Sequence, residues 1–392
     1  MNPLQEKSKS VLAGVDQAVS FAELFFDLVF VFSVTQVVHL LHGSFDWVHV
    51  SRSVLVFWLV WWGWTQFTWA LNAADTTHHW IQLGTLIATG IAFFMAIGVP
   101  EAFSDHAWWF AMSYVAVRSI GLLIYLWVAW EDPEMRNVVK GFSALSIAGM
   151  IAVIVGGLVG GVAQYWIWGL GIILDIIAAS IGGNKSGWNL HPKHFTERHG
   201  LFIIIALGET LIVAASGVAT GSWTGSLLIV AVLSVGITGC LWWLYFSRVK
   251  DKLEHVVSLK TGADQSQTAR DVFSLLHFPM LCGLIIYAYA IEESMTHPDQ
   301  PLSFNGRLAL ALGIICFSGG LIVVLWRATG KINYMRLGFT IATAGLVLSI
   351  SHVSVIWTLA LAIGGLFAIC FLEEMKPSGA PEFPEGDLII DE

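Results

Sequence analysis

The feature that most constrains this chain is a succession of apolar runs, each about 20 residues long. As a helix, a run of that length spans the roughly 30 Å hydrocarbon core of a bilayer and satisfies its own backbone hydrogen bonds. Charged residues make up only 12% of the chain, about half the share typical of soluble domains. These features predict an all-α polytopic transmembrane bundle. They make the lipid bilayer its expected partner, with no role for nucleic acid.

Polar residues and Gly or Pro breaks divide the apolar sequence into about twelve predicted spans. These are residues 18–42, 47–71, 80–103, 107–130, 141–161, 163–183, 199–219, 223–247, 271–294, 305–327, 333–350 and 353–373. The least marked divisions are a turn at Gly160 to Gln164 and a turn at Ser349 to His352. With the N-terminus in the cytoplasm, 16 of the 19 Lys and Arg residues fall on the cytoplasmic side. We therefore expect a multi-pass protein of the cytoplasmic membrane with both termini cytoplasmic.

The predicted spans fall into two sets of six. We expect a cytoplasmic segment at residues 1–17, a first half at 18–190, a second half at 191–375 and a disordered acidic cytoplasmic tail at 376–392. Both halves open with Leu-Phe, at Leu24 and at Leu201, so they are candidates for a parallel repeat. The polar, basic stretch 248–270 is predicted to be a cytoplasmic loop, either solvated or in contact with lipid or a partner.

Six ionisable residues well inside predicted spans are our candidates for a substrate- or ion-binding site. They are Glu23, Asp27, Arg118, Asp175, Glu209 and His277. Glu23 and Asp27 are four residues apart and therefore share one helix face. Pro279 follows His277 closely and should disturb the helix and free a backbone carbonyl.

The charges in this set do not balance. Arg118 can neutralise only one of Asp27, Asp175 and Glu209, and an unpaired anion in hydrocarbon is very costly. Some of the acids are therefore protonated, or a cation or basic ligand lies among them, or water reaches them. The alternative is a structural ion-pair network that fixes helix packing. For His277, a hydrogen-bonded core histidine is an equally good interpretation.

The span that contains Glu209 opens with polar residues, of which Glu197 and Arg198 are expected to form a structural collar at the start of its helix. The histidines at 191, 194 and 199 match no helical ligand spacing, so we predict neither a metal site nor a cofactor. The tryptophans between 58 and 69 are denser than an interfacial belt requires. They fit a packed core, or the aromatic wall of a ligand pocket.

Three stretches together resemble the bacterial low-temperature-requirement A (LtrA) family of integral membrane proteins. They are ELFFDLVFVFSVTQ at 23–36, ERHGLFIIIALGET at 197–210 and LLHFPMLCGLIIYAYAIEE at 275–293. The resemblance covers roughly residues 18–375 and carries the family pattern onto Glu23, Phe26, Asp27, Glu197, Arg198, Gly208, Glu209 and His277. The chain differs from the family pattern at position 199, where it has a histidine, His199, and the family usually has an aromatic residue. The resemblance implies a membrane protein linked to growth in the cold, without a settled substrate or reaction.

Three functions fit these observations. The first is a secondary transporter coupled to protons or a cation, with Asp27, Asp175 and Glu209 as ion or proton sites and His277 as a relay. The second is a membrane-embedded enzyme acting on a lipid or isoprenoid, with Glu209 or Asp27 as general acid or base. The third is a non-catalytic membrane scaffold. Transport is the preferred hypothesis, because no nucleophile and base stand at a recognisable spacing.

Overall fold

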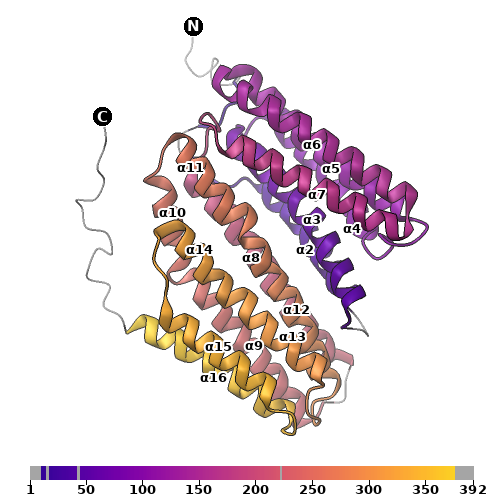
Figure 1. Cartoon of the computed structure of the whole chain (residues 1–392), viewed down its shortest axis with the longest axis vertical. Coiled ribbons are helices and arrows are strands. Elements are labelled where there is room, and N and C mark those ends of the chain that lie inside the picture. Colours follow the sequence, from indigo (N-terminus) through magenta and orange to yellow (C-terminus); the bar gives the residue numbers. More distant parts are fainter. Residues whose placement is uncertain (1–9, 15–16, 42–44, 221–222, 376–392) are drawn as a thin grey trace.

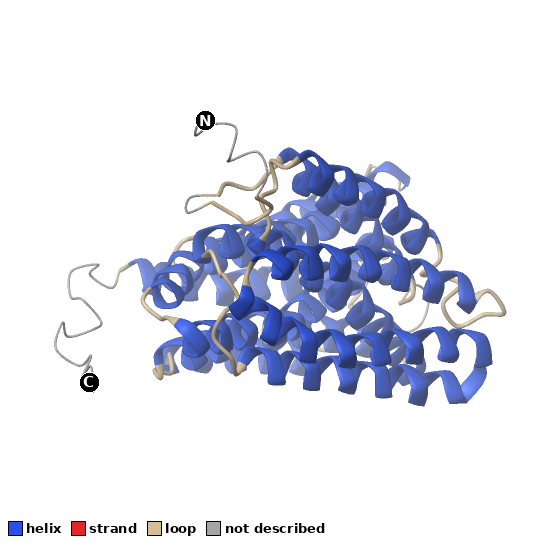
Figure 2. Cartoon of the chain, turned by 90° about the horizontal axis from the view of Figure 1, so that it is seen from above, coloured by secondary structure: helices blue, strands red, loops and turns tan. Residues whose placement is uncertain are grey.

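The computed structural model describes residues 10–14, 17–41, 45–220 and 223–375. Within these ranges the chain is almost entirely helical and contains no strand (Figure 2). The acidic tail at 376–392 and most of the N-terminal segment lie outside the described residues. The predicted all-α fold is confirmed.

The helices follow the predicted spans closely. Their bounds are α2 Phe21–His39, α3 Trp47–Ala73, α4 His79–Ile97, α5 Ala107–Glu131, α6 Pro133–Val159, α7 Gly161–Gly183, α8 Pro192–Thr220, α9 Gly225–Phe246, α10 Val249–Ser258, α11 Gly262–Ala269, η1 Arg270–Leu275, α12 His277–Thr296, α13 Phe304–Ile314, η2 Ile315–Gly319, α14 Gly320–Thr329, α15 Tyr334–Ser349 and α16 Val355–Glu374. In the described part of the chain, eleven helical segments are long and apolar enough to cross a membrane. The remaining predicted span, 333–350, corresponds to the shorter apolar helix α15, which has 16 residues.

Both of the least marked divisions are confirmed. Gly160 and Gly161 have φ angles of 66° and 60°, a backbone conformation that favours glycine, and they separate α6 from α7. At the other division, α15 ends at Ser349 and α16 begins at Val355.

The stretch 248–270, predicted as a loop, is instead packed and helical. It forms α10 and α11 and continues through the π-helix η1 into α12. Val249, Leu253, Val256 and Val257 are buried on one face of α10, which packs against α8 and α14. The basic residues lie between these apolar positions, so the overall polarity of the stretch concealed an amphipathic helix.

The two halves of the chain lie side by side (Figure 1), α2–α7 on one side and α8–α16 on the other. At the seam, α2 and α3 contact α8 and α12. We call the end of the bundle where α2 and α8 begin, and where α3, α5 and α7 end, the basic end. The ion pairs Arg248–Glu374, Arg327–Asp271 and Arg336–Glu373 lie there.

Neighbouring helices follow the same order in both halves. In the first half α2 packs against α4, α4 against α5, α5 against α6 and α6 against α7. In the second, α8 packs against α12, α12 against α13, α13 against α15 and α15 against α16. The second span also contacts the sixth in each half, as α3 with α7 and α9 with α16. A parallel six-span duplication would produce this arrangement, and it remains our proposal for the origin of the two halves.

Candidate functional site

The seam between the halves contains a buried cluster of two carboxylates and one guanidinium group, Glu23, Asp27 and Arg198. Arg198 donates from Nη1 to Glu23 Oε1 and from Nη2 to Asp27 Oδ1, both at 2.7 Å. Glu23 and Arg198 are completely buried and Asp27 is 3% exposed. Asp27 Oδ2 is buried and has no hydrogen-bond partner among the described residues.

Local sequence rules place these side chains. Ser20 and Glu23 form a capping box at the start of α2, in which Ser20 N–H donates to Glu23 Oε2 at 2.8 Å. Asp27 follows one helical turn later on the same face. Across the seam, His194 and Arg198 are also four residues apart on α8, so a pair of acids faces a pair of basic residues.

His194 joins this cluster to the surface of the basic end. Its Nε2 lies 3.0 Å from Glu23 Oε1, and its Nδ1 lies 3.0 Å from Asn72 Nδ2. Asn72 has a fixed orientation, because its amide accepts from His191 N–H at 2.9 Å and donates to the His191 carbonyl at 3.0 Å. His194 also lines a cavity of about 540 Å³ together with Lys193, Glu197 and Glu254.

A second buried pair, Arg118 and Asp175, lies within the first half. Arg118 donates from Nη1 to Asp175 Oδ2 at 2.7 Å and from Nη2 to Asp175 Oδ1 at 2.9 Å, a bidentate contact. Tyr114 Oη accepts a further bond from Nη1 at 3.0 Å, and Gln66 Oε1 accepts from Nε at 2.5 Å. Gly149 on α6 leaves space for this pair, since a Cβ there would lie 3.2 Å from Asp175 Oδ1.

Helix α3 lies between the two buried charge sites. Trp64 donates from Nε1 to Asp27 Oδ1 at 2.7 Å, while Gln66, two residues later, contacts Arg118. Trp61 and Trp69 donate to the carbonyl and the hydroxyl of Ser274, at 2.8 and 2.9 Å, and so hold η1 against α3. The tryptophans of α3 therefore serve both as packing and as hydrogen-bond donors.

Glu209 and His277 lie apart from these two sites. Glu209 is 2% exposed and accepts a short hydrogen bond from the Thr35 hydroxyl on α2. His277 lies within hydrogen-bond distance of the Val272 carbonyl through Nδ1, at 2.7 Å, and of Tyr245 Oη through Nε2, at 2.9 Å. The carbonyl can only accept, so Nδ1 carries the proton and Nε2 accepts from Tyr245. His277 is thus a satisfied core histidine, and it donates to a π-helix carbonyl near Pro279.

The structure therefore separates the residues that the sequence grouped. Glu23 and Asp27 meet Arg198, Arg118 meets Asp175, and Glu209 and His277 each have other partners. Arg198 differs from the expectation, because it is fully buried in an ion cluster rather than in a polar collar, whereas Glu197 borders the cavity beside His194. The earlier start of α8, at Pro192, brings Arg198 inside the bundle. Sequence reasoning missed His194, Trp64 and Gln66, although the spacing of His194 and Arg198 mirrors that of Glu23 and Asp27.

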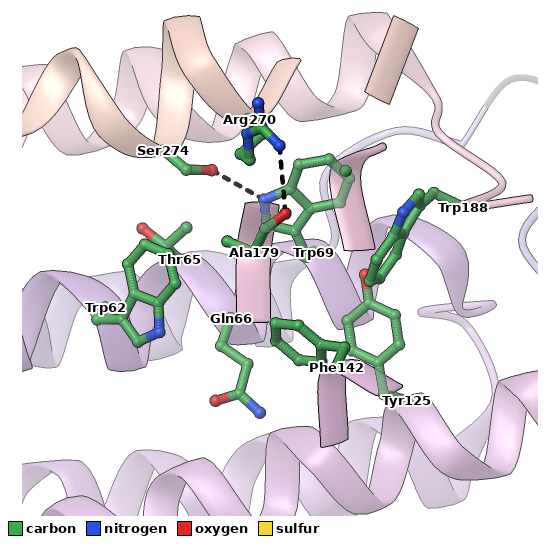
Figure 3. A pocket seen from close by; sticks show the side chains of 11 residues that line it. Trp62, Thr65, Gln66, Trp69, Tyr125, Phe142, Ala179, Trp188, Arg270 and Ser274 are labelled. Atoms are coloured by element: carbon green, nitrogen blue, oxygen red, sulfur yellow. Dashed lines mark hydrogen bonds between the residues drawn. The ribbon is translucent and has the colours of Figure 1, made fainter. Parts of the chain in front are cut away.

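An aromatic cavity of about 40 Å³ lies next to the Arg118 site (Figure 3). Rings of Trp62, Trp69, Tyr125, Phe142 and Trp188 form most of its wall, and Arg270 lies at one side. The hydroxyl groups of Tyr125 and Thr65 are buried here without a hydrogen-bond partner among the described residues. Unpartnered buried hydroxyl groups are costly, so water or a ligand is expected to bind them. Of the tryptophans between 58 and 69, for which the sequence left a packed core or a pocket wall open, Trp62 and Trp69 line this cavity.

In the described part of the chain, no three His, Cys, Asp or Glu side chains gather closely enough to hold a metal ion. The helices, the buried charges and the lipid-facing apolar surface define a multi-pass α-helical membrane protein. Residues 18–371 match the family model of the bacterial low temperature requirement A protein. The chain belongs to this LtrA family.

A relative of the chain is an uncharacterised protein, RA0937, of Rhizobium meliloti (strain 1021). It is 30% identical over 316 residues, which cover 77% of this chain and 75% of the relative. No solved structure matches the chain.

Proposed function

We propose that this protein is a secondary transporter coupled to protons, and that the cluster of Glu23, Asp27 and Arg198 binds the coupling proton. The observation that carries the proposal is the unpartnered Oδ2 of Asp27, inside a cluster with two carboxylates and one guanidinium group. An unpaired buried anion is very costly, and one bound proton makes the cluster neutral. If the cluster served only to hold the two halves together, one carboxylate would be enough to neutralise Arg198.

The wider charge count supports the same proposal. The four acids Glu23, Asp27, Asp175 and Glu209 are buried with two guanidinium groups, those of Arg118 and Arg198. Apart from the buried Arg336–Glu373 pair and Arg307, which lie near the ends of the bundle, this set has a net charge of 2 − 4 = −2 when the buried histidines are neutral. Arg118 and Asp175 neutralise each other, so the excess belongs to the Arg198 cluster and to Glu209. Glu209 is eleven residues beyond Arg198 on α8, about 16 Å along the helix, and we assign it as a second proton site.

We place a small polar group of the solute in the aromatic cavity, whose volume of about 40 Å³ admits roughly three water-sized groups. No carboxylate lines it to attract a cation, and the nearby Arg118 is neutralised by Asp175. Arg270 is already paired with Asp271 at 2.6 Å, so it offers little to an anion. The free hydroxyl groups of Tyr125 and Thr65 favour a small uncharged molecule with a hydroxyl or carbonyl group. Following the positive-inside rule, we orient the basic end, and therefore the opening beside His194, toward the cytoplasm of the bacterial inner membrane.

The test is the charge displaced by a pH jump in proteoliposomes on a solid-supported membrane. Binding of a proton inside the bundle displaces charge, so the wild type should give a transient current. Asp27→Asn should lose most of it, and Glu374→Gln, at an exposed ion pair, should keep it. Equal currents from wild type and Asp27→Asn would overturn the proposal.

A further inference from the structure

The cavity beside α8 ends at a histidine that contacts the buried cluster. It is about 540 Å³ in volume, and its lining includes the exposed Lys193 and the half-buried Glu197 and Glu254. His194 lines the same cavity although the residue is only 1% exposed. The side chain thus separates the water of the basic end from the carboxylate of Glu23.

The hydrogen bonds around His194 define its tautomer. Because both groups of the Asn72 amide bond the backbone of His191, its nitrogen must face His194 Nδ1. An amide nitrogen only donates, so Nδ1 presents a lone pair and the proton is on Nε2. Nε2, which has no aligned hydrogen-bond partner among the described residues, lies 3.0 Å from Glu23 Oε1, close enough for proton transfer once the ring turns toward that oxygen.

We infer that His194 is the proton-access site of the Glu23, Asp27 and Arg198 cluster, and that Asn72 is the gate that keeps it neutral. The inference rests on the proposed function and identifies the residue through which its proton enters. When Asn72 separates from Nδ1, a hydronium ion in the cavity protonates that nitrogen. The bond from Nε2 to hydrogen breaks and a bond from Glu23 Oε1 to hydrogen forms. His194 leaves the step neutral, with its proton on Nδ1.

The charges around His194 suit this step. On α2 it faces Glu23, and on its own helix Lys193, Glu197 and Arg198 are nearby, while α10 contributes Glu254 across the cavity. The acids at the cavity attract hydronium ions from the surrounding water. Protonation of Glu23 leaves Arg198 with Asp27 as its single ionised carboxylate, so the cluster becomes neutral.

The inference concerns a rate, so kinetics test it. The protein in nanodiscs receives protons from a photolysed caged acid, and infrared absorption follows the carbonyl stretch of the protonated carboxyl groups. His194→Ala should slow the rise of this band at least tenfold without changing its final amplitude. Imidazole, which the cavity has room for, should restore the rate. His199→Gln is the matched control, because His199 is buried on the same helix but bonds the Phe195 carbonyl at 2.8 Å.

Unchanged kinetics in His194→Ala would overturn the inference and leave the proposed function intact. If His194→Gln restored the rate of the carboxyl band as fully as imidazole does, the inference would also be overturned. Glutamine can pack and form hydrogen bonds, but it cannot carry the proton. If the wild type shows no carboxyl band, the cluster takes no proton and both ideas fail. If the wild type shows the carboxyl band with the expected kinetics but no charge displacement in proteoliposomes, only the proposal of transport would be contradicted.

Discussion

Replacement of Arg198 by methionine should be among the most destabilising single changes in the seam. Arg198 makes two charged hydrogen bonds of 2.7 Å from a completely buried position. Arg198→Met keeps most of the volume but leaves Glu23 and Asp27 without a cation. Removal of one partner of a buried pair costs about 3–5 kcal/mol. That corresponds to about a 10²- to 10⁴-fold change in the unfolding equilibrium.

The measurement is equilibrium unfolding in mixed detergent and SDS micelles, with Arg248→Met as the control. Arg248 pairs with Glu374 at 3.2 Å at the surface, where such pairs contribute about 0–1 kcal/mol. The triple variant Arg198→Met, Glu23→Gln, Asp27→Asn should recover most of the lost stability, because no buried charge remains in it. If Arg198→Met costs no more than Arg248→Met, the cluster does not stabilise the seam as we describe.

Three further changes have defined outcomes. Arg118→Lys loses the bidentate contact with Asp175 and the bond to Gln66, and it should cost about 2–3 kcal/mol in the same unfolding assay; a cost near zero would contradict the bidentate geometry. Gly156→Ala would force a Cβ into the Trp168 ring and should cost about 1–3 kcal/mol, whereas Gly169→Ala, with no heavy atom within 4 Å, should be nearly neutral. Tyr125→Phe removes a hydroxyl group that has no protein partner among the described residues, so it should change the stability by less than about 1 kcal/mol while it weakens solute-dependent currents; unchanged currents would show that this hydroxyl group does not bind the solute.

Much of the fold was predictable because bilayer thickness fixes helix length, and polar, Gly or Pro breaks separate one span from the next. Glycine at positive φ explains the turn between α6 and α7, which in the sequence is marked only by Gly160, Gly161 and Gln164. The stretch 248–270 was misjudged because its polarity drew attention away from the apolar face of α10. Composition alone does not show which face of a short helix meets a neighbour.

The buried charges were predictable as residues but not as partners. Asp27, Arg118, Asp175 and Glu209 were each identified from an ionisable group in an apolar run. Their pairing depends on the lateral order of the helices, which span lengths do not determine. Arg198 was misplaced because a charge at a helix start is usually solvated, whereas here α8 begins at Pro192 and carries it into the seam.

The central claim is that the cluster of Glu23, Asp27 and Arg198 holds one exchangeable proton. Infrared difference spectra between neutral and alkaline pH, recorded on protein with ¹³C-labelled aspartate, test it directly. We expect a protonated carboxyl band that is present at neutral pH, disappears on alkalinisation, and is altered or lost in Asp27→Asn. If Asp27 shares the proton with Glu23, part of the band should change in frequency when the aspartate carries the ¹³C label. A spectrum of Asp27→Asn identical to that of the wild type would contradict the account.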